Sequence, residues 1–357
     1  MPGCPRSQIV DFSEVGCYHC FSRCVRRAFL CGEDPYTEKN YDHRKGWLEQ
    51  RLKFVASCMA LDVIGAAILD NHYHVVLRNR PDLVEKWSDR EVARRWLMLY
   101  PGTRRPTQQP IQPTEEQIAE LLADDKKLAA VRQRLSSLSW FMKFVNEDLA
   151  RRSNAEDEVS GAFWEERFKS TRLLDAFAIL LCAMYVDLNL IRAQIAETPE
   201  ASRYTSAFLR IQARQARLAQ ALSHSPKPGQ ANRVNQSELE AACWLAPVDV
   251  TAPPPDGAQA ELGRRASDQG FLEMTLDDYL SLLDWSGRQL RCDKRGAIPA
   301  HLGPILERLQ VDVDFWLAGL ENFRDWYRTM AGRVQTLVKH ARENGRRWFQ
   351  GVGKCPA

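Results

Sequence analysis

The sequence predicts an α+β fold built on a small antiparallel sheet. Residues 16–24, 62–67 and 68–78 form short runs rich in Val, Ile, Cys and aromatic residues, which is typical of strands. Between the first two runs, residues 34–60 carry apolar side chains at helical spacing. Strand, helix, strand, strand is the opening of a ferredoxin-like unit, and we therefore expect that architecture.

A helical insertion is predicted to interrupt this unit over about residues 82–152. Residues 90–100 and 128–152 have apolar positions at helical spacing, and the stretch 101–113 between them is rich in Pro, Gln and Thr. Thr114, with Gln117 three positions later, has the pattern of a capping box, so we expect a helix to begin there. The simplest interpretation of the insertion is an additional packing layer.

The rest of the chain is expected to complete the sheet and to add a second domain. Residues 163–173 are predicted to form a strand, and a helix is predicted from Asp175, its N-cap, to about Ala196. Two Pro- and Gly-rich stretches further on are typical of linkers. We therefore expect three parts: a domain over 1–222, a linker region over 223–270 and a smaller helical domain over 271–357.

Composition limits the class of protein. The chain has 357 residues, of which 45% are hydrophobic and 27% charged, values typical of globular proteins, and its net charge is only +3. It has no apolar secretory signal and no run of eighteen apolar residues, so we expect a cytoplasmic protein with reduced cysteines and no membrane span. A zinc site at Cys17, Cys20, Cys24 and Cys31 is conceivable, but the spacing lacks two clean Cys-x-x-Cys pairs.

Two histidines stand on the predicted strand over 68–78. His72 and His74 are two positions apart, and strand side chains alternate between faces, so both imidazoles share one face and Tyr73 lies on the other. Two imidazoles on a rigid strand make half of a metal site. Taken alone, the motif is more often an ordinary pair of strand-end histidines.

A second polar group lies on the helix that is predicted to follow Asp175. Tyr185, Asn189 and Arg192 are separated by four and three positions, so they lie along one helical face. These three side chains are costly to bury in an apolar core without partners. A cleft against the histidine strand would supply such partners.

Four motifs in order carry a resemblance to a known family. The stretches NHYHVVL and YVDLNLIRA, together with YHCFSRCVRRAFL and FWEERFKSTRLLD, resemble the Y1 single-strand DNA transposases of the HUH class, and most closely the REP-associated tyrosine transposases. The resemblance covers residues 17 to about 209. This chain has Leu190 and Gln194 where the family usually has Pro and Gly, and Leu69-Asp70 where it usually has Met-Pro.

The resemblance implies a ferredoxin-like HUH domain that cuts and rejoins single-stranded DNA. Tyr185 would be the catalytic nucleophile and would form a 5′-phosphotyrosine, which conserves the bond energy for rejoining. His72, His74 and Asn189 would bind one Mg²⁺ or Mn²⁺ ion, which would act as a Lewis acid on the scissile phosphate. Mn²⁺ is the better match to nitrogen ligands.

Six basic residues are candidates for DNA contacts. Arg23, Arg26 and Arg27 follow the first strand, and a solvated basic turn is an equally good interpretation. Arg167 and Lys169 share a face of the fourth strand and could hold phosphates, although strand-edge charges also prevent edge pairing. Arg192 could steady the phosphate or form a salt bridge within the fold. The insertion over 82–152 could likewise act as a clamp beside the DNA.

The partner implied by the resemblance is single-stranded DNA with REP-like hairpins and a short flanking guide, and a monomer is slightly favoured over a homodimer. Three alternatives remain open at this point. The first is a hairpin-binding protein of the same fold that has lost cleavage. The second is an RNA-directed or toxin-like nuclease that does not need the tyrosine, and the third is a hydrolytic zinc enzyme.

Overall fold

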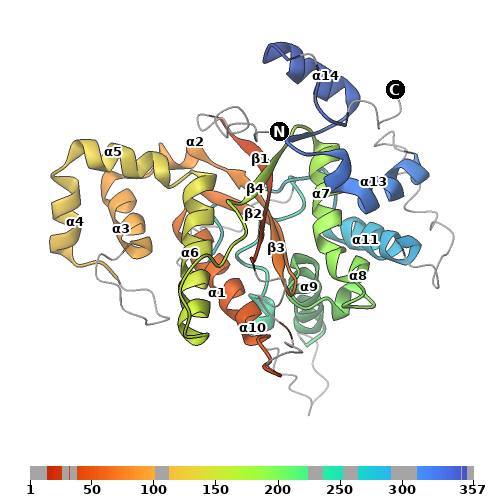
Figure 1. The fold of residues 1–357 in the computed structure, drawn as a ribbon, viewed down its shortest axis with the longest axis horizontal. Helices are drawn as coiled ribbons and strands as arrows, with labels where there is room; N and C mark the ends of the chain where they lie inside the picture. The colour runs from red at the N-terminus through yellow and green to blue at the C-terminus, as the bar shows by residue number, and fades with distance from the viewer. Residues whose placement is uncertain are drawn as a thin grey trace.

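A computed structural model describes residues 14–25, 32, 38–100, 112–223, 236–251, 264–290, 312–346 and 348–351. The fold is α+β, with a five-stranded sheet and many helices (Figure 1). The strands are β1 (Gly16–Arg23), β2 (Leu61–Ile68), β3 (His72–Asn79), β4 (Lys169–Leu173) and β5 (Met330–Ala331).

The strand order is β2-β3-β1-β4-β5. All neighbouring strands are antiparallel except β4 and β5, which are parallel. In this register Phe21 of β1 lies opposite both His74 of β3 and Lys169 of β4, so these three side chains share one face of the sheet.

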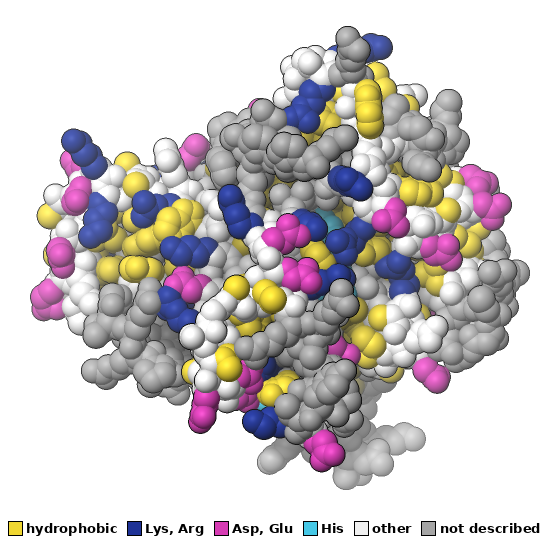
Figure 2. Space-filling model, in the orientation of Figure 1, with side chains coloured by type: hydrophobic (Ala, Val, Ile, Leu, Met, Phe, Trp, Pro, Cys, Tyr) yellow, Lys and Arg dark blue, Asp and Glu magenta, His cyan; other side chains and the backbone are white. Residues whose placement is uncertain are grey.

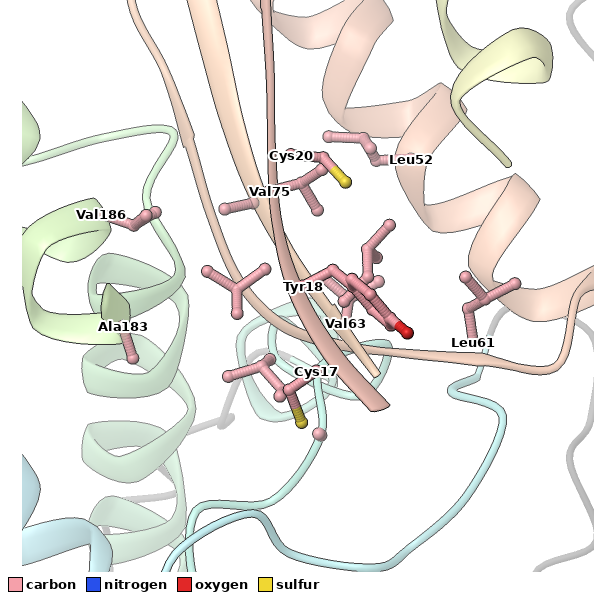
Figure 3. Close-up of a cluster of buried hydrophobic side chains, with 14 of the residues drawn as sticks. Cys17, Tyr18, Cys20, Leu52, Leu61, Val63, Val75, Ala183 and Val186 are labelled. Atoms are coloured by element: carbon pink, nitrogen blue, oxygen red, sulfur yellow. The ribbon is translucent and has the colours of Figure 1, made fainter. Parts of the chain in front are cut away.

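Helices cover both faces of the sheet. On one face lie α1 (His43–Cys58) and α6 (Leu138–Glu156), and Tyr73 points toward them, because its hydroxyl donates to Asn146 Oδ1 of α6 at 2.6 Å. On the other face lie α7 (Ala176–Asp187) and α9 (Ser206–Ser223). Figure 3 shows Leu52 of α1 and Val186 of α7 on opposite sides of the strands, so the sheet is the middle layer of the core.

The insertion between β3 and β4 contributes its own helices. These are α2 (Pro81–Val84), α3 (Asp89–Leu99), α4 (Glu115–Leu122), α5 (Asp125–Arg134) and α6. The predicted capping box at Thr114 and Gln117 is confirmed, with both reciprocal hydrogen bonds formed. The single helix predicted over 128–152 is instead two, because the chain turns between α5 and α6.

Two predicted boundaries were wrong. The strand predicted over 163–173 is regular only from Lys169, because the preceding residues make a single bridge between Trp164 and Cys24 and then turn. The helix predicted from Asp175 to about Ala196 is broken at Leu188 (φ −88°, ψ 0°) into α7 and the short α8 (Asn189–Arg192). Asp175 does cap α7, accepting a hydrogen bond from the Ala178 amide at 2.8 Å.

The C-terminal helices share the core of the sheet. They are α11 (Leu276–Leu290), α13 (Val313–Trp326) and α14 (Val334–Glu343), with β5 between the last two and the short α10 (Gln236–Leu239) further upstream. β5 pairs with β4, and α13 packs against α7, so described parts of 271–357 contact the sheet and its covering helix. Residues 291–311 of the predicted helical domain lie outside the described residues.

A buried ion pair joins the sheet to the segment before α11. Asp62 of β2 is fully buried and accepts hydrogen bonds from Arg78 Nε at 2.9 Å and from the Ser267 amide at 2.8 Å. Arg78 also donates to the carbonyl oxygens of Gln269 and Gly270. The predicted linker region is therefore fixed to the sheet around residues 267–270.

Within the described ranges, none of the helices combines the length and the apolar composition needed to span a membrane.

Candidate active site

His72 and His74 lie together at the start of β3. Their ring centroids are 5.0 Å apart with an interplanar angle of 83°. His74 is fully buried, whereas His72 is partly exposed. The two imidazoles share a face of the sheet and Tyr73 occupies the other, as the alternation predicts.

In both rings the Nδ1 atom is engaged by a neighbouring side chain. His72 Nδ1 lies 2.5 Å from Asn71 Oδ1, and His74 Nδ1 lies 2.9 Å from Nε2 of His19 on β1. His74 Nε2 is buried and has no hydrogen-bond partner among the described atoms. A buried polar atom without a partner is costly, and Nε2 of His74 is available to a further group.

The predicted nucleophile lies on α7, directly over the histidines. The Tyr185 ring is 5.6 Å from the His74 ring, edge to face, and 6.0 Å from the His19 ring. α7 is apolar all round, as expected for a helix buried between the sheet and a further layer. Apart from Asp187 at its C-terminal end, α7 is apolar around Tyr185, whose phenol lies where the helix crosses the histidines.

Asn189 and Arg192 follow beyond the break at Leu188. Asn189 is the first residue of α8 and is buried, and its Nδ2 atom has no partner within the described part of the chain. The Arg192 guanidinium lies over the Tyr185 ring, 4.7 Å from its centroid. The stripe predicted from the sequence is thus retained across the break, with Tyr185 and Arg192 in contact.

Helix α13 covers this group, which the sequence does not predict. Phe323 stacks on Tyr185 with centroids 5.2 Å apart, and Arg324 lies over Phe21 at 3.9 Å. Arg192 Nη2 donates to the Glu321 carbonyl oxygen at 2.6 Å. No sequence motif links residues 321–324 to the histidines, because this contact depends entirely on how the C-terminal helices return to the sheet.

The site is cationic, and its histidines are neutral. Burial and then the Arg324 charge lower the pKa of His19 to about 3, and burial followed by the charges of Arg23 and Arg324 lowers that of His72 to about 4. Burial and neighbouring groups, including Arg192, hold the pKa of His74 well below its ordinary value. Figure 2 shows Lys and Arg side chains around a small exposed histidine surface near the centre of one face. Neutral imidazole is the form that binds metal ions.

The donor set fits a divalent ion held by two imidazoles and one amide oxygen. The engaged Nδ1 atoms leave Nε2 of both histidines for the ion, and the side chain of Asn189, whose Nδ2 atom has no partner in the described ranges, carries the amide oxygen that would be the third donor. No group of three His, Cys, Asp or Glu side chains suited to a metal occurs in the described ranges. Cys17, Cys20 and Cys24 are buried and form no disulfide in that part of the chain, and Cys31 lies outside it.

The predicted DNA-contact residues divide into three groups. Arg23 is exposed and close enough to His72 to lower its pKa, and Arg192 lies in the site itself. Lys169 is exposed on the same sheet face but forms an ion pair with Glu166, and Arg167 is exposed outside β4. Arg26 and Arg27 lie outside the described residues. Arg324 is the cation that the sequence did not predict.

Asp187 lies on the opposite side of α7 from this group. Its carboxylate accepts hydrogen bonds from the Ser206 hydroxyl, the Ala207 amide and the Tyr279 hydroxyl, and it is fully buried. These partners belong to α9 and α11. Asp187 therefore anchors α7 within the core and is not directed at the histidines.

No protein-family model matches the sequence, and no curated protein matches it. Among solved structures, the chain is similar to one described as a REP-associated tyrosine transposase bound to a REP hairpin, with 9% sequence identity and a TM-score of 0.31. The match covers 62% of this chain and 88% of the other. A likeness at this level is a distant one and carries no argument about activity, so the proposals below depend on the residues of the site.

Proposed function

We propose that this protein is an HUH-type, metal-dependent single-strand DNA endonuclease and strand transferase with a ferredoxin-like core. The observation that carries the proposal is the position of Tyr185, whose ring lies 5.6 Å from a histidine with a buried, uncommitted Nε2 atom. A phenol beside two neutral imidazoles and an amide suits nucleophilic attack on an activated phosphate.

The reaction exchanges one phosphate ester for another. The Tyr185 oxygen attacks phosphorus, the bond from phosphorus to the 3′ oxygen breaks, and the phenol loses its proton while the 3′ oxygen gains one. The 5′ end is then held on Tyr185, and a 3′-hydroxyl can attack it to rejoin a strand. Because the ester is conserved, no nucleotide cofactor is required.

His72, His74 and Asn189 would hold one Mg²⁺ or Mn²⁺ ion. When bound, the ion supplies a Lewis acid for the scissile phosphate. The residues of the chain orient their donor atoms: β3 fixes both imidazoles, and the hydrogen bonds at Nδ1 fix their ring planes. Arg192 and Arg324 add positive charge beside the reacting group, which favours a phosphate there.

The substrate is proposed to be single-stranded DNA carrying REP-like hairpins. Arg23 and Lys169 lie on the sheet face that carries the site and could track the backbone, with Arg167 exposed nearby in sequence. Tyr185 and His74 belong to the same chain and contact each other, so a monomer can hold a complete site.

A second candidate is hairpin binding without cleavage. The observation that favours it is the cover on the site, since Tyr185 is only 5% exposed and His74 is fully buried beneath α13. The two candidates differ in whether α13 moves. A protein that only binds DNA can leave the end of α13 in place. Cleavage requires that this end moves, so that Tyr185 and His74 are uncovered.

The deciding experiment is a cleavage assay on labelled single-stranded DNA that carries hairpins from the sequence flanking the gene. The full chain is incubated with Mn²⁺ or Mg²⁺, with an EDTA control, and protein–DNA adducts are separated under denaturing conditions. We expect a metal-dependent covalent adduct that Tyr185→Phe abolishes. The matched control, Tyr204→Phe, removes a hydroxyl from a different element and should leave the adduct unchanged.

Each other outcome favours another candidate. Hairpin binding without any adduct, even for the wild type with Mn²⁺, would establish the binding protein. Cleavage that persists in Tyr185→Phe would remove the tyrosine from the reaction and favour a hydrolytic nuclease.

A further inference from the structure

His19 is a buried histidine that the proposed chemistry does not use. It lies on β1, is 3% exposed, and is paired in the sheet with Val76 of β3 and Thr171 of β4. Its ring is nearly parallel to that of His74, with centroids 5.1 Å apart and an interplanar angle of 12°. The hydrogen bond between His19 Nε2 and His74 Nδ1 is 2.9 Å long.

One proton is shared between these two nitrogens, and its position decides what His74 can bind. If His74 Nδ1 carries the proton and donates to His19, then His74 Nε2 presents a lone pair. If His19 donates instead, His74 Nε2 carries the proton and presents an N–H. Only the first arrangement makes His74 a metal ligand.

The surroundings of His74 Nε2 favour the lone pair. No hydrogen-bond partner of either kind lies within reach of this buried atom in the described part of the chain, so an N–H there would remain unsatisfied, whereas a lone pair there would be satisfied by the proposed ion. At His72 the same outcome follows from Asn71, whose Oδ1 atom can only accept, so Nδ1 of His72 carries the proton and donates the hydrogen bond.

We propose that His19 is a positioning residue that holds His74 in its Nδ1–H tautomer, so that the Nε2 lone pair is presented to the metal ion. This inference rests on the proposed function. It assigns a supporting role to a residue outside the histidine motif, because His19 orients the proposed ligand His74. Partners of this kind typically change metal affinity by about 10- to 100-fold.

The tautomer can be measured without any metal. In the full-length protein with ¹⁵N-labelled histidine, two-dimensional NMR distinguishes Nδ1–H from Nε2–H imidazoles, and His74→Gln assigns the His74 signals. We expect His74 as Nδ1–H in the wild type. An Nε2–H signal for His74 in the metal-free wild type would overturn the proposal.

The second measurement is Mn²⁺ affinity by titration calorimetry. His19→Phe keeps an aromatic ring but cannot accept the proton, and we expect its affinity to fall about 10- to 100-fold. His19→Gln offers an amide oxygen in a similar place and should recover most of the loss. The matched control is His340→Phe on α14, away from the site, which should bind Mn²⁺ as the wild type does. Circular dichroism confirms that each variant is folded.

The outcomes separate this inference from the proposed function. A folded His19→Phe protein with wild-type Mn²⁺ affinity would overturn the inference and leave the endonuclease proposal intact. A wild type that binds no Mn²⁺ and forms no adduct would overturn both.

Discussion

Phe323 of α13 and Tyr185 of α7 form a stacked pair, with ring centroids 5.2 Å apart and an interplanar angle of 28°. The contact joins residues 138 positions apart (323 minus 185) and leaves Tyr185 5% exposed. Beside it, α13 departs from helical geometry at Asn322 (φ −113°, ψ 17°). If Tyr185 attacks a phosphate as proposed, the end of α13 after this kink is the element that has to move first.

Shortening Phe323 should speed the first step of cleavage. Phe323→Leu keeps an apolar side chain but removes the ring that stacks on Tyr185. The contact between the end of α13 and Tyr185 is therefore weaker. We expect the initial rate of adduct formation to rise several-fold, measured with hairpin DNA and Mn²⁺ by denaturing gel electrophoresis.

The control for this variant comes from the same helix. Phe315→Leu shortens a ring that stacks on Phe177, away from Tyr185, and should leave the rate unchanged. A folded Phe323→Leu protein that forms the adduct at the wild-type rate would show that the stack does not limit access.

Asn189 should be required for metal binding but not for folding. Asn189 is buried, and its Nδ2 atom has no partner among the described residues. Asn189→Ala therefore removes the proposed metal ligand without breaking a hydrogen bond of Nδ2. We expect Mn²⁺ affinity to fall at least about tenfold and adduct formation to be lost, whereas Asn189→Asp should retain both because a carboxylate oxygen also suits Mn²⁺. Unchanged calorimetric affinity in Asn189→Ala would exclude it as a ligand.

Stability should fall in mild acid because the site histidines are buried and neutral. Burial lowers the pKa of His19 to about 3 and that of His72 to about 4, from an ordinary 6.5. Between pH 4 and pH 6.5 the unfolded chain binds more protons than the folded one. The free energy of unfolding therefore rises with pH in this range, and stability is lost as pH falls from 6.5 toward 4.

This loss can be assigned to a single histidine. Urea unfolding at pH 7 and pH 5 should give a lower midpoint at pH 5, and the difference should be smaller in His19→Gln, which has no group to protonate. Equal differences in the two proteins would mean that His19 does not contribute to the acid sensitivity.

Breaking the buried pair of Asp62 and Arg78 should cost far more than breaking an exposed one. Asp62→Ala leaves the Arg78 charge buried without its carboxylate, for an expected loss of about 3–5 kcal/mol in unfolding free energy. Asp277→Ala breaks the exposed pair with Arg214 and should cost about 0–1 kcal/mol. Chemical denaturation measures both, and similar losses would show that the Asp62 pair is not the anchor of residues 267–270.

The local parts of this fold were predictable from sequence because short-range geometry determines them. The shared face of His72 and His74 follows from the two-residue period of a strand. The caps at Thr114 and Asp175 follow from side chains that satisfy free backbone amides at a helix start. The stripe of Tyr185 and Arg192 follows from the helical repeat.

The remaining features depend on contacts between distant segments. No Gly or Pro stands at the break at Leu188. Because these are the residues that usually end a helix, the sequence predicted a continuous apolar helix. The strand at Met330 has two residues, too few to show a period. His19 has no partner within its own segment, and its hydrogen bond to His74 exists only because β1 and β3 are neighbours in the sheet.

The pairing of β5 with β4 has a consequence for the order in which the protein is made. The Thr171 hydroxyl donates to the Arg328 carbonyl oxygen at 2.7 Å, across 157 positions of sequence. During synthesis, the histidines, Tyr185 and the unpaired edge of β4 therefore emerge from the ribosome well before α13 and β5, which cover them. A nascent chain that stops between residues 210 and 312 has every proposed reacting group and no α13, so translation past residue 326 is the step that turns an uncovered site into a covered one.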